Sequence, residues 1–258
     1  MMQQPLRPVR PIVFAYDFPH KKTQDFILAL VANGHRPSAV IAAPFQSLPV
    51  PPPALRVKAR HIGLLEPSAL CAALGIEYLR MAHDSTECLL HLDVLAPQVG
   101  VVAGARILPS DVLERFPHGV INLHPGLLPV ARGLDALQWS LYRGLPLGVT
   151  AHLIDARVDA GWLLASCIVD ELPDDTLVDL SLRLYEKQLE MLRDAVVRAT
   201  TVRRDELSPL VGGSYNRSFP ASLVPQLREK VRARRRLLRR GGAVYAEGTG
   251  ATAGALCP

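Results

Sequence analysis

Apolar and polar positions follow one another in blocks that predict strands and helices in turn. Residues 11–15 (PIVFA) form a short apolar run that predicts a buried strand, and residues 23–31 carry apolar positions at helical spacing. Asn33-Gly34 is a typical helix stop, and residues 39–43 (AVIAA) predict a second strand. This strand-helix-strand order is typical of a parallel sheet with helices on its faces.

The same alternation continues to about residue 200. Further strands are expected at residues 77–81, 99–103, 120–122, 148–153 and 162–169. Helices are expected within residues 66–95, at 110–116 and 134–143, and in a long segment that starts at Thr176. We therefore expect an α/β fold with a Rossmann-like, mostly parallel sheet flanked by helices, in a catalytic domain that spans residues 1–200.

Residues 201–258 differ in composition from this domain. Between Arg198 and Arg240 the chain has twelve Lys and Arg residues against three acidic residues, although its whole net charge is only +5. Residues 227–240 (LREKVRARRRLLRR) predict a basic helix, and residues 241–258, rich in glycine and alanine, predict a poorly ordered tail. We expect a short basic C-terminal appendage whose helix is a solvated face or an oligomer contact, as in a homodimer. Aromatic residues make up only 5% and no nucleic-acid-binding motif is found, so nucleic acid is not an expected partner.

Cysteines and apolar runs bear on the compartment. The four cysteines show no CxxC spacing and no neighbouring histidine cluster, which is typical of reduced thiols and not of a metal site. Residues 1–10 are polar and proline-rich, unlike a signal peptide, and no apolar run has the length of a membrane span. We expect a cytoplasmic protein with no metal and no membrane partner.

Three polar side chains in residues 120–167 predict a reactive site. Asn122 and His124 lie two residues apart at the end of an expected strand, so both side chains point to the same face. Pro125-Gly126 then ends the strand, and ligand sites of open parallel sheets lie beyond the carboxyl ends of strands. Asp159 lies in a turn-like VDAG segment. An amide, an imidazole and a carboxylate together suit acyl transfer, as oxyanion donor, base and the acid that tunes the base.

The motif around these residues resembles a known family. NLHPGLLPVARG, followed after a gap by GVTAHLIDARVDAGWLL, is similar to the folate-dependent formyltransferases, whose pattern is Asn-x-His-Pro-Ser-Leu-Leu-Pro, then Gly-x-(Thr/Ser)-x-His and Asp-x-Gly. That family acts on glycinamide ribonucleotide, on methionyl-tRNA and on amino sugars. The resemblance covers residues 95–170 well and the preceding residues in outline.

This resemblance implies 10-formyltetrahydrofolate as the formyl donor. It implies that Asn122 stabilises the tetrahedral oxyanion, that His124 manages the proton of the attacking amine, and that Asp159 supports His124. It also implies two segments that hold the folate. The segment before and including Arg106-Ile107-Leu108 resembles the one that cradles the pterin, and Ile154-Asp155-Ala156-Arg157 resembles the loop that closes its other side.

The acceptor is less constrained by the sequence. The first strand-to-helix turn carries Tyr16, His20 and Lys21, which with Arg132 are candidate acceptor-binding residues, but it lacks a glycine-rich phosphate cradle. The residues after 200 are too few for the C-terminal barrel of the methionyl-tRNA enzymes. We therefore expect a small-molecule amine as the acceptor, first of all a nucleotide-linked amino sugar. The alternatives are an amino-acid-derived amine of the hydroxyornithine type, hydrolysis of 10-formyltetrahydrofolate, and a non-catalytic binding module.

Overall fold

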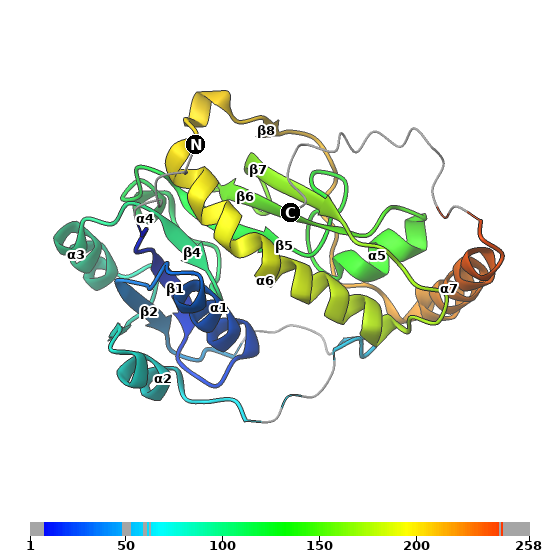
Figure 1. Ribbon diagram of the computed structural model, residues 1–258, viewed down its shortest axis with the longest axis horizontal. Helices are drawn as coiled ribbons and strands as arrows, with labels where there is room; N and C mark the ends of the chain where they lie inside the picture. The colour runs from blue at the N-terminus through cyan, green and yellow to red at the C-terminus, as the bar shows by residue number, and fades with distance from the viewer. Residues whose placement is uncertain (1–7, 48–52, 59–60, 62, 243, 245–258) are drawn as a thin grey trace, which may run out of the picture. The chain divides into compact units, whose positions relative to one another are not determined.

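The computed structural model describes residues 8–47, 53–58, 61, 63–242 and 244 (Figure 1). Its eight strands form one sheet with the order β3-β2-β1-β4-β5-β6-β7-β8. Their bounds are β1 Ile12–Tyr16, β2 Ala39–Ala43, β3 Glu77–Arg80, β4 Gly100–Val102, β5 Val120–His124, β6 Gly148–Ile154, β7 Gly161–Ile168 and β8 Pro209–Leu210.

The chain divides into two compact units. The first contains the residues up to Gln46, His61–Asn122 and Leu192–Glu206, and the second contains Ser47–Arg60, Leu123–Met191 and the residues from Leu207 onward. The chain passes from one unit to the other within β5 and again within helix α6 (Leu177–Thr201).

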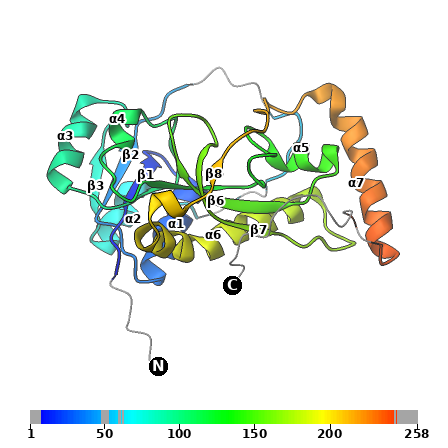
Figure 2. The ribbon, with the colours of Figure 1, turned by 90° about the horizontal axis from the view of Figure 1, so that it is seen from above.

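The first unit is the expected parallel α/β structure. Strands β1 to β5 pair in parallel with one another, and β1 pairs with β2 on one side and with β4 on the other. Ile12, Val13 and Phe14 of β1 are fully buried, as expected for a strand covered on both faces. Helices α1 (Lys21–Ala32) and α3 (Thr86–Leu95) lie on opposite sides of these strands (Figure 2). The unit also contains α2 (Pro67–Leu74), α4 (Ser110–Leu113) and the 3₁₀ turn Arg204–Glu206.

The strand order of the first unit places a topological switch between β1 and β4. The chain proceeds from β1 outward to β3 and then returns to β4 on the other side of β1. Ligands of open α/β sheets bind beyond the carboxyl ends of strands at such a switch. Both Tyr16, at the end of β1, and the segment that follows Val102 of β4 therefore lie at the edge where a ligand is expected.

The second unit contains the antiparallel part of the sheet. Strands β6 and β7 pair antiparallel, with a register irregularity between Ala151 and His152, and β7 pairs antiparallel with the short β8. The expected strands at 148–153 and 162–169 are confirmed. Their direction could not be deduced from apolar runs alone, and β8 was not expected. The turn between β6 and β7 contains Asp159 in the left-handed region, with a φ of 47°.

Gly161 at the start of β7 provides a stability prediction. Its φ is +113°, and a Cβ at this position would overlap the carbonyl oxygen of Leu153 on β6. We expect Gly161→Ala to lower the free energy of unfolding by more than about 2 kcal/mol, because both strain and overlap act there. Gly144→Ala is the control, since Gly144 has a φ of +71° but open space around its Cβ, so only strain acts. Equal losses for the two variants in denaturant unfolding would contradict this explanation.

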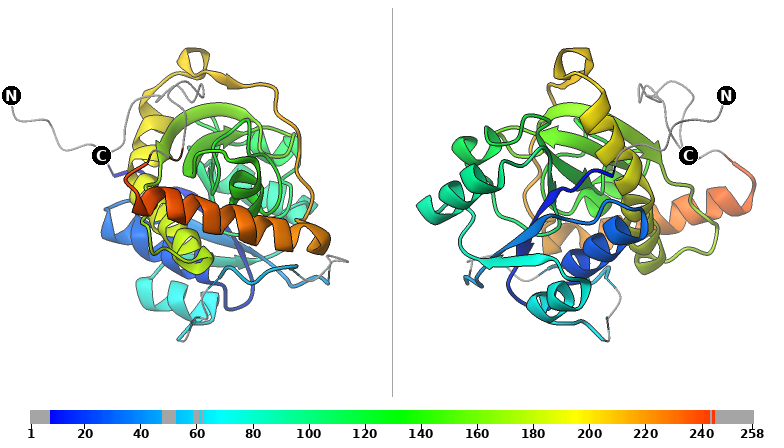
Figure 3. Two further views of the ribbon diagram at one scale, coloured as in Figure 1. Left: turned by 90° about the vertical axis from the view of Figure 1, so that its right-hand side faces the viewer. Right: turned by 60° about the vertical axis from the view of Figure 1, so that its left-hand side comes forward.

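The C-terminal segment folds within the second unit and is not a separate body. Helix α7 (Val224–Arg239), preceded by the 3₁₀ turn Ala221–Leu223, lies against α5 (Ala136–Arg143; Figure 3). Residues 207–242 belong to the second unit, and helix α6 itself continues to Thr201. The division into a catalytic domain of residues 1–200 and a short C-terminal extension stays a prediction. The expected basic helix at 227–240 is confirmed, whereas the tail prediction concerns residues that lie outside the described ones except for 241, 242 and 244.

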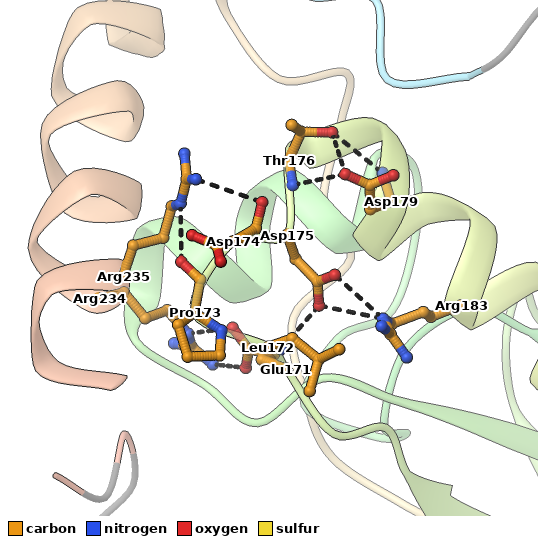
Figure 4. A network of polar contacts seen from close by, with 10 residues as sticks. All are labelled: Glu171, Leu172, Pro173, Asp174, Asp175, Thr176, Asp179, Arg183, Arg234 and Arg235. Atoms are coloured by element: carbon orange, nitrogen blue, oxygen red, sulfur yellow. Dashed lines mark hydrogen bonds and ion pairs between the residues drawn. The ribbon is translucent and has the colours of Figure 1, made fainter. Parts of the chain in front are cut away.

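Ion pairs join α7 to the loop before α6 (Figure 4). Arg234 forms a buried salt bridge with Glu171, with side-chain exposures of 8% and 5%, and Arg235 donates to the carbonyl oxygens of Pro173 and Asp174. Beside this loop, Thr176 and Asp179 exchange hydrogen bonds in a capping box at the start of α6. Part of the basic charge of α7 is thus paired within the unit.

Three further expectations concern thiols, metals and membranes. Cys71 and Cys88 are buried free thiols whose pKa values burial raises to about 11. Among the described residues, no three His, Cys, Asp or Glu side chains gather in a group that could hold a metal ion, and no helix has the length and apolarity of a membrane span.

Candidate active site

Strand β5 carries Asn122 and His124 at alternate positions. Asn122 is half-buried, and His124 is 5% exposed at the last position of the strand. Pro125-Gly126 ends β5, as expected. A Cβ on Gly126 would lie 2.9 Å from Cβ of Ala131 and 3.1 Å from Nε2 of His124. The turn thus leaves little room for a side chain at position 126, where the related pattern has serine and this chain has glycine.

The structure brings His124 and Asp159 together, as the sequence predicted. The His124 Nδ1 lies 3.3 Å from Asp159 Oδ1, and its Nε2 lies 2.7 Å from the carbonyl oxygen of Ala131. Both ring nitrogens thus face an oxygen acceptor, an arrangement that is fully satisfied when the ring is protonated and donates from both sides. A substrate amine that transfers a proton to Nε2 would have to take the place of Ala131 O.

Asp159 is held by hydrogen bonds to both carboxylate oxygens. Its Oδ2 accepts from the backbone N–H of Gly133 at 2.8 Å, while Oδ1 faces His124. Burial by itself raises the pKa of Asp159, but the hydrogen bond and charge of His124 and the Gly133 N–H together bring that pKa below its ordinary value. The carboxylate is therefore ionised at neutral pH and can balance the charge of an imidazolium.

Arg132 forms contacts within the same unit. Its guanidinium donates to the carbonyl oxygens of Val158, at 2.7 Å, and Gly212, at 3.2 Å, and its buried Nε has no partner among the described residues. Arg132 therefore ties the turn that carries Asp159 to the segment after β8. This structural role does not test its predicted contact with the acceptor.

The first candidate folate segment follows β4 in the first unit. The backbone N–H groups of Ala103 and Gly104 donate to the carbonyl oxygen of Phe14, so the segment leaves the sheet beside the end of β1. Beyond them, Arg106 contacts Gln46, Ile107 is 67% exposed and Leu108 is buried. The side chain of Ile107 is thus an exposed apolar surface in this segment.

The second candidate folate segment is Ile154-Asp155-Ala156-Arg157, between β6 and β7. Arg157 donates to Asp155 from its backbone N–H at 2.8 Å and from its guanidinium at 2.6 Å. Burial by itself raises the pKa of Asp155. The hydrogen bonds from Arg157 lower that pKa by more, so it lies below its ordinary value. This pairing gives the exposed turn a defined shape. Its contact with folate stays a prediction.

The candidate acceptor residues of the first unit have local structural contacts. The Tyr16 hydroxyl donates to the carbonyl oxygen of Ala105 at 3.1 Å, and burial raises the pKa of Tyr16. His20 is the N-cap of α1, where its Nδ1 accepts from the backbone N–H of Thr23, and Lys21 forms an ion pair with Asp25. Tyr16 thus lies beside the first candidate folate segment. None of these contacts tests acceptor binding.

The sequence reasoning missed Asn216. This residue is 4% exposed, and its backbone forms an isolated bridge with Gly133, the residue that donates to Asp159. Asn216 lies more than fifty residues beyond the motif, in a short polar stretch that we assigned to the appendage. The signal that could have indicated it is the pair Gly212-Gly213 just before it, since adjacent glycines often mark a close approach of two backbones.

Comparisons with known proteins agree with this geometry. Residues 53–196 match the model of a family described as formyl transferase. The methionyl-tRNA formyltransferase of Thermus thermophilus is 35% identical over 153 residues, which cover 58% of this chain and 46% of that protein. The chain thus spans about half the length of the curated relatives it matches.

Solved structures show the same fold. The sugar N-formyltransferase of a Shewanella species has a TM-score of 0.56 and 20% identity, over 80% of this chain and 76% of that chain. The phosphoribosylglycinamide formyltransferase of Anaplasma phagocytophilum also has a TM-score of 0.56 and 20% identity, over 74% and 86% of the two chains. At this identity the likeness establishes the α/β fold and not the substrate.

Proposed function

Since the chain belongs to the formyl transferase family, we propose that it transfers a formyl group from 10-formyltetrahydrofolate to a primary amine. The observation that carries this proposal is the pair of His124 and Asp159 at the end of β5, with Asn122 two residues earlier on the same strand. An imidazole held against an ionised carboxylate is suited to accept and return the proton of an attacking amine.

In the proposed reaction the amine nitrogen attacks the formyl carbon and a C–N bond forms. The carbonyl oxygen becomes an oxyanion that the Asn122 amide N–H stabilises, a contribution on the order of 3 kcal/mol. His124 receives the proton of the amine, and Asp159 balances the imidazolium. The bond from the formyl carbon to N10 of the folate then breaks, and N10 takes up the proton, so that tetrahydrofolate and the formamide are the products.

For the donor, we propose the two candidate folate segments as its binding elements. Residues 103–108 and 154–157 both leave the end of a strand, and each segment contains two exposed residues. Folate can bind to such segments through main-chain hydrogen bonds, which need no particular side chain. A donor analogue that shields the amides of Ile107 and Ala156 from hydrogen exchange would support this assignment, and unchanged exchange at both would refute it.

For the acceptor, we propose the amino group of a nucleotide-linked amino sugar. Sugar N-formyltransferases are among the structural neighbours that share the fold of this chain. The candidate side chains Tyr16, His20, Lys21 and Arg132 carry the hydroxyl, imidazole and cationic groups that suit a sugar phosphate, and a bound acceptor would have to share or replace their contacts within the protein. An amino-acid-derived amine of the hydroxyornithine type is the alternative small molecule.

A second candidate acceptor is the amino group of an aminoacyl-tRNA. Two observations favour it. Methionyl-tRNA formyltransferases are among the relatives of this chain, with 31–35% identity over 153 and 189 residues. Helix α7 also exposes Arg228, Arg232 and Arg236, and cations on one element suit a phosphate backbone. Nucleic acid, which the composition did not predict as a partner, is therefore included among the acceptors to be tested.

Incubation with 10-formyltetrahydrofolate and a panel of amines distinguishes these possibilities. Tetrahydrofolate release that requires a nucleotide-linked amino sugar would support the proposal, and release that requires methionyl-tRNA would support the second candidate. Release without any amine would indicate a hydrolase. No release with any amine would indicate a binding module.

Compartment and assembly also stay proposals. We propose a cytoplasmic enzyme, because Cys71 and Cys88 are free thiols, which are common in reducing compartments. The exposed arginines of α7 make this helix a candidate homodimer contact. Sedimentation equilibrium of the wild type and of the charge-reversal variant Arg232→Glu would test this contact. We expect a dimer in the wild type and a weaker dimer in the variant, and a monomeric wild type would exclude that role.

A further inference from the structure

One peptide group links Asp159 to the C-terminal part of the chain. The N–H of this group belongs to Gly133 and donates to Asp159 Oδ2 at 2.8 Å. Its carbonyl oxygen belongs to Arg132 and accepts from both the backbone N–H, at 3.0 Å, and the side-chain Nδ2, at 2.8 Å, of Asn216. Because a trans peptide is planar and its N–H and C=O point in opposite directions, fixing the oxygen also fixes the direction of the N–H.

Asn216 is itself held at every polar group of its residue. Its carbonyl oxygen accepts from the N–H of Leu134 at 2.8 Å, and its Oδ1 accepts from the Arg143 guanidinium at 2.7 Å. The side chain is buried, and the backbone of Gly133 approaches so closely that a Cβ there would overlap the Asn216 carbonyl group. The Asn216 amide supplies a donor to Arg132 O and an acceptor to Arg143 from two separate atoms.

The segment that carries Asn216 is anchored on either side. We call residues 211–219 the strap. At one end a Cβ on Gly213 would overlap the carbonyl oxygen of Pro129, which indicates backbone contact. At the other end the N–H of Phe219 donates to Asp135 at 2.8 Å, and its buried ring lies 4.9 Å from that of Trp139. The strap is therefore a fixed support for the loop of residues 129–135.

We propose that Asn216 is a positioning residue that orients the Arg132–Gly133 peptide, and through it Asp159 and His124, for proton transfer. This inference rests on the proposed function, because it assumes that the His124–Asp159 pair works in formyl transfer. Asn216 contacts none of the reacting groups itself. It acts on the carboxylate that faces His124 Nδ1 at 3.3 Å.

The alternative is that Asn216 only stabilises the fold. Substitution of a purely structural residue would change the melting temperature and the amount of folded enzyme. It would not change the pH dependence of kcat/KM for the enzyme that is folded. Loss of the Gly133 N–H contact would instead raise the pKa of Asp159, because that hydrogen bond contributes to keeping it low. The acid limb of kcat/KM would then move to higher pH.

The test compares two variants of the full chain with a matched control. Asn216→Ala removes both side-chain hydrogen bonds, and Asn216→Asp keeps the size and the acceptor for Arg143 but places an oxygen against Arg132 O. Gln188→Ala is the control, because Gln188 is a buried amide of α6 whose Nε2 donates to Leu184 O within the same helix. For both Asn216 variants we expect kcat to fall on the order of 10- to 100-fold, with KM for the donor within about twofold and the acid limb shifted upward.

Hydrogen exchange of the Gly133 amide gives a readout that does not depend on activity. We expect faster exchange in both Asn216 variants and unchanged exchange in Gln188→Ala. Unchanged Gly133 exchange, or a fall in kcat that Gln188→Ala reproduces with the same pH profile, would overturn the proposal. If the wild type shows the protected Gly133 amide but no formyl transfer, the proposed function fails while the positioning of the peptide by Asn216 stands.

Discussion

Replacement of His124 by alanine is expected to lower the rate of formyl transfer by about 10²–10⁴-fold, the usual loss when a proton-transfer group is removed. The loss should appear in kcat, because His124 acts on the amine proton and not on the folate. Donor affinity, measured by equilibrium binding, should stay within severalfold of the wild type. Steady-state kinetics with the acceptor found in the amine panel provides the measurement.

A second histidine variant controls for the loss of an imidazole side chain outside the site. His118 lies in the turn before β5, and its backbone N–H donates to the carbonyl oxygen of Gln98. His118→Ala is expected to keep nearly full activity. Near-normal turnover of His124→Ala would show that the reaction does not use this ring.

Replacement of Asp159 by asparagine is expected to have a comparable effect, a loss of about 10²-fold or more in kcat. The amide lacks the charge that balances an imidazolium, and its NH₂ group can donate to Nδ1 and so favour the wrong tautomer of His124. The Gly133 N–H can still donate to the remaining side-chain oxygen, so the loop should keep its shape. Wild-type kinetics in Asp159→Asn, with the fold intact by circular dichroism, would contradict the role of this carboxylate.

The lowered pKa of Asp159 also predicts a pH dependence of stability. A carboxyl group whose pKa is lower in the folded than in the unfolded protein stabilises the fold above its unfolded pKa, near 3.8. This contribution is lost as the pH falls through the lower, folded-state pKa. Urea unfolding between pH 6 and pH 3 should therefore show a steeper loss of stability in the wild type than in Asp159→Asn. If the plots of unfolding free energy against pH are parallel for the wild type and Asp159→Asn, the pKa of Asp159 in the folded protein is at its ordinary value.

Most of the fold could be predicted from the sequence because its signals are local. The apolar run of residues 11–15, the helix stop at Asn33-Gly34 and the run of residues 39–43 each determine an element without information from elsewhere in the chain. The expected strands and helices up to residue 200 were found with small shifts of their ends. The antiparallel direction of β7 was not predicted, although the link of residues 155–160 between β6 and β7 carries it, because a parallel crossover needs a dozen or more residues.

The site was predictable where its geometry follows from the backbone. Strand alternation placed Asn122 and His124 on one face, and the motif connected Asp159 to His124. The contacts of Asn216 with Arg132 and of Arg132 with Gly212 could not be predicted, because each joins a side chain to the backbone of a segment about eighty residues away. Polar residues such as Asn in a glycine-containing stretch have many possible partners. Only the packed structure shows which partner is used.

The central claim is that this chain moves a formyl group onto an amine with His124 and Asp159 as the proton-handling pair. It is tested most directly with 10-formyltetrahydrofolate that carries ¹³C in its formyl group. We expect wild-type enzyme to place the label on the nitrogen of an amine from the panel, with one tetrahydrofolate released for each formamide formed, and His124→Ala and Asp159→Asn to do so at least about 10²-fold more slowly. Label that appears only as free formate, or equal rates of formamide formation in the wild type and both variants, would contradict the claim.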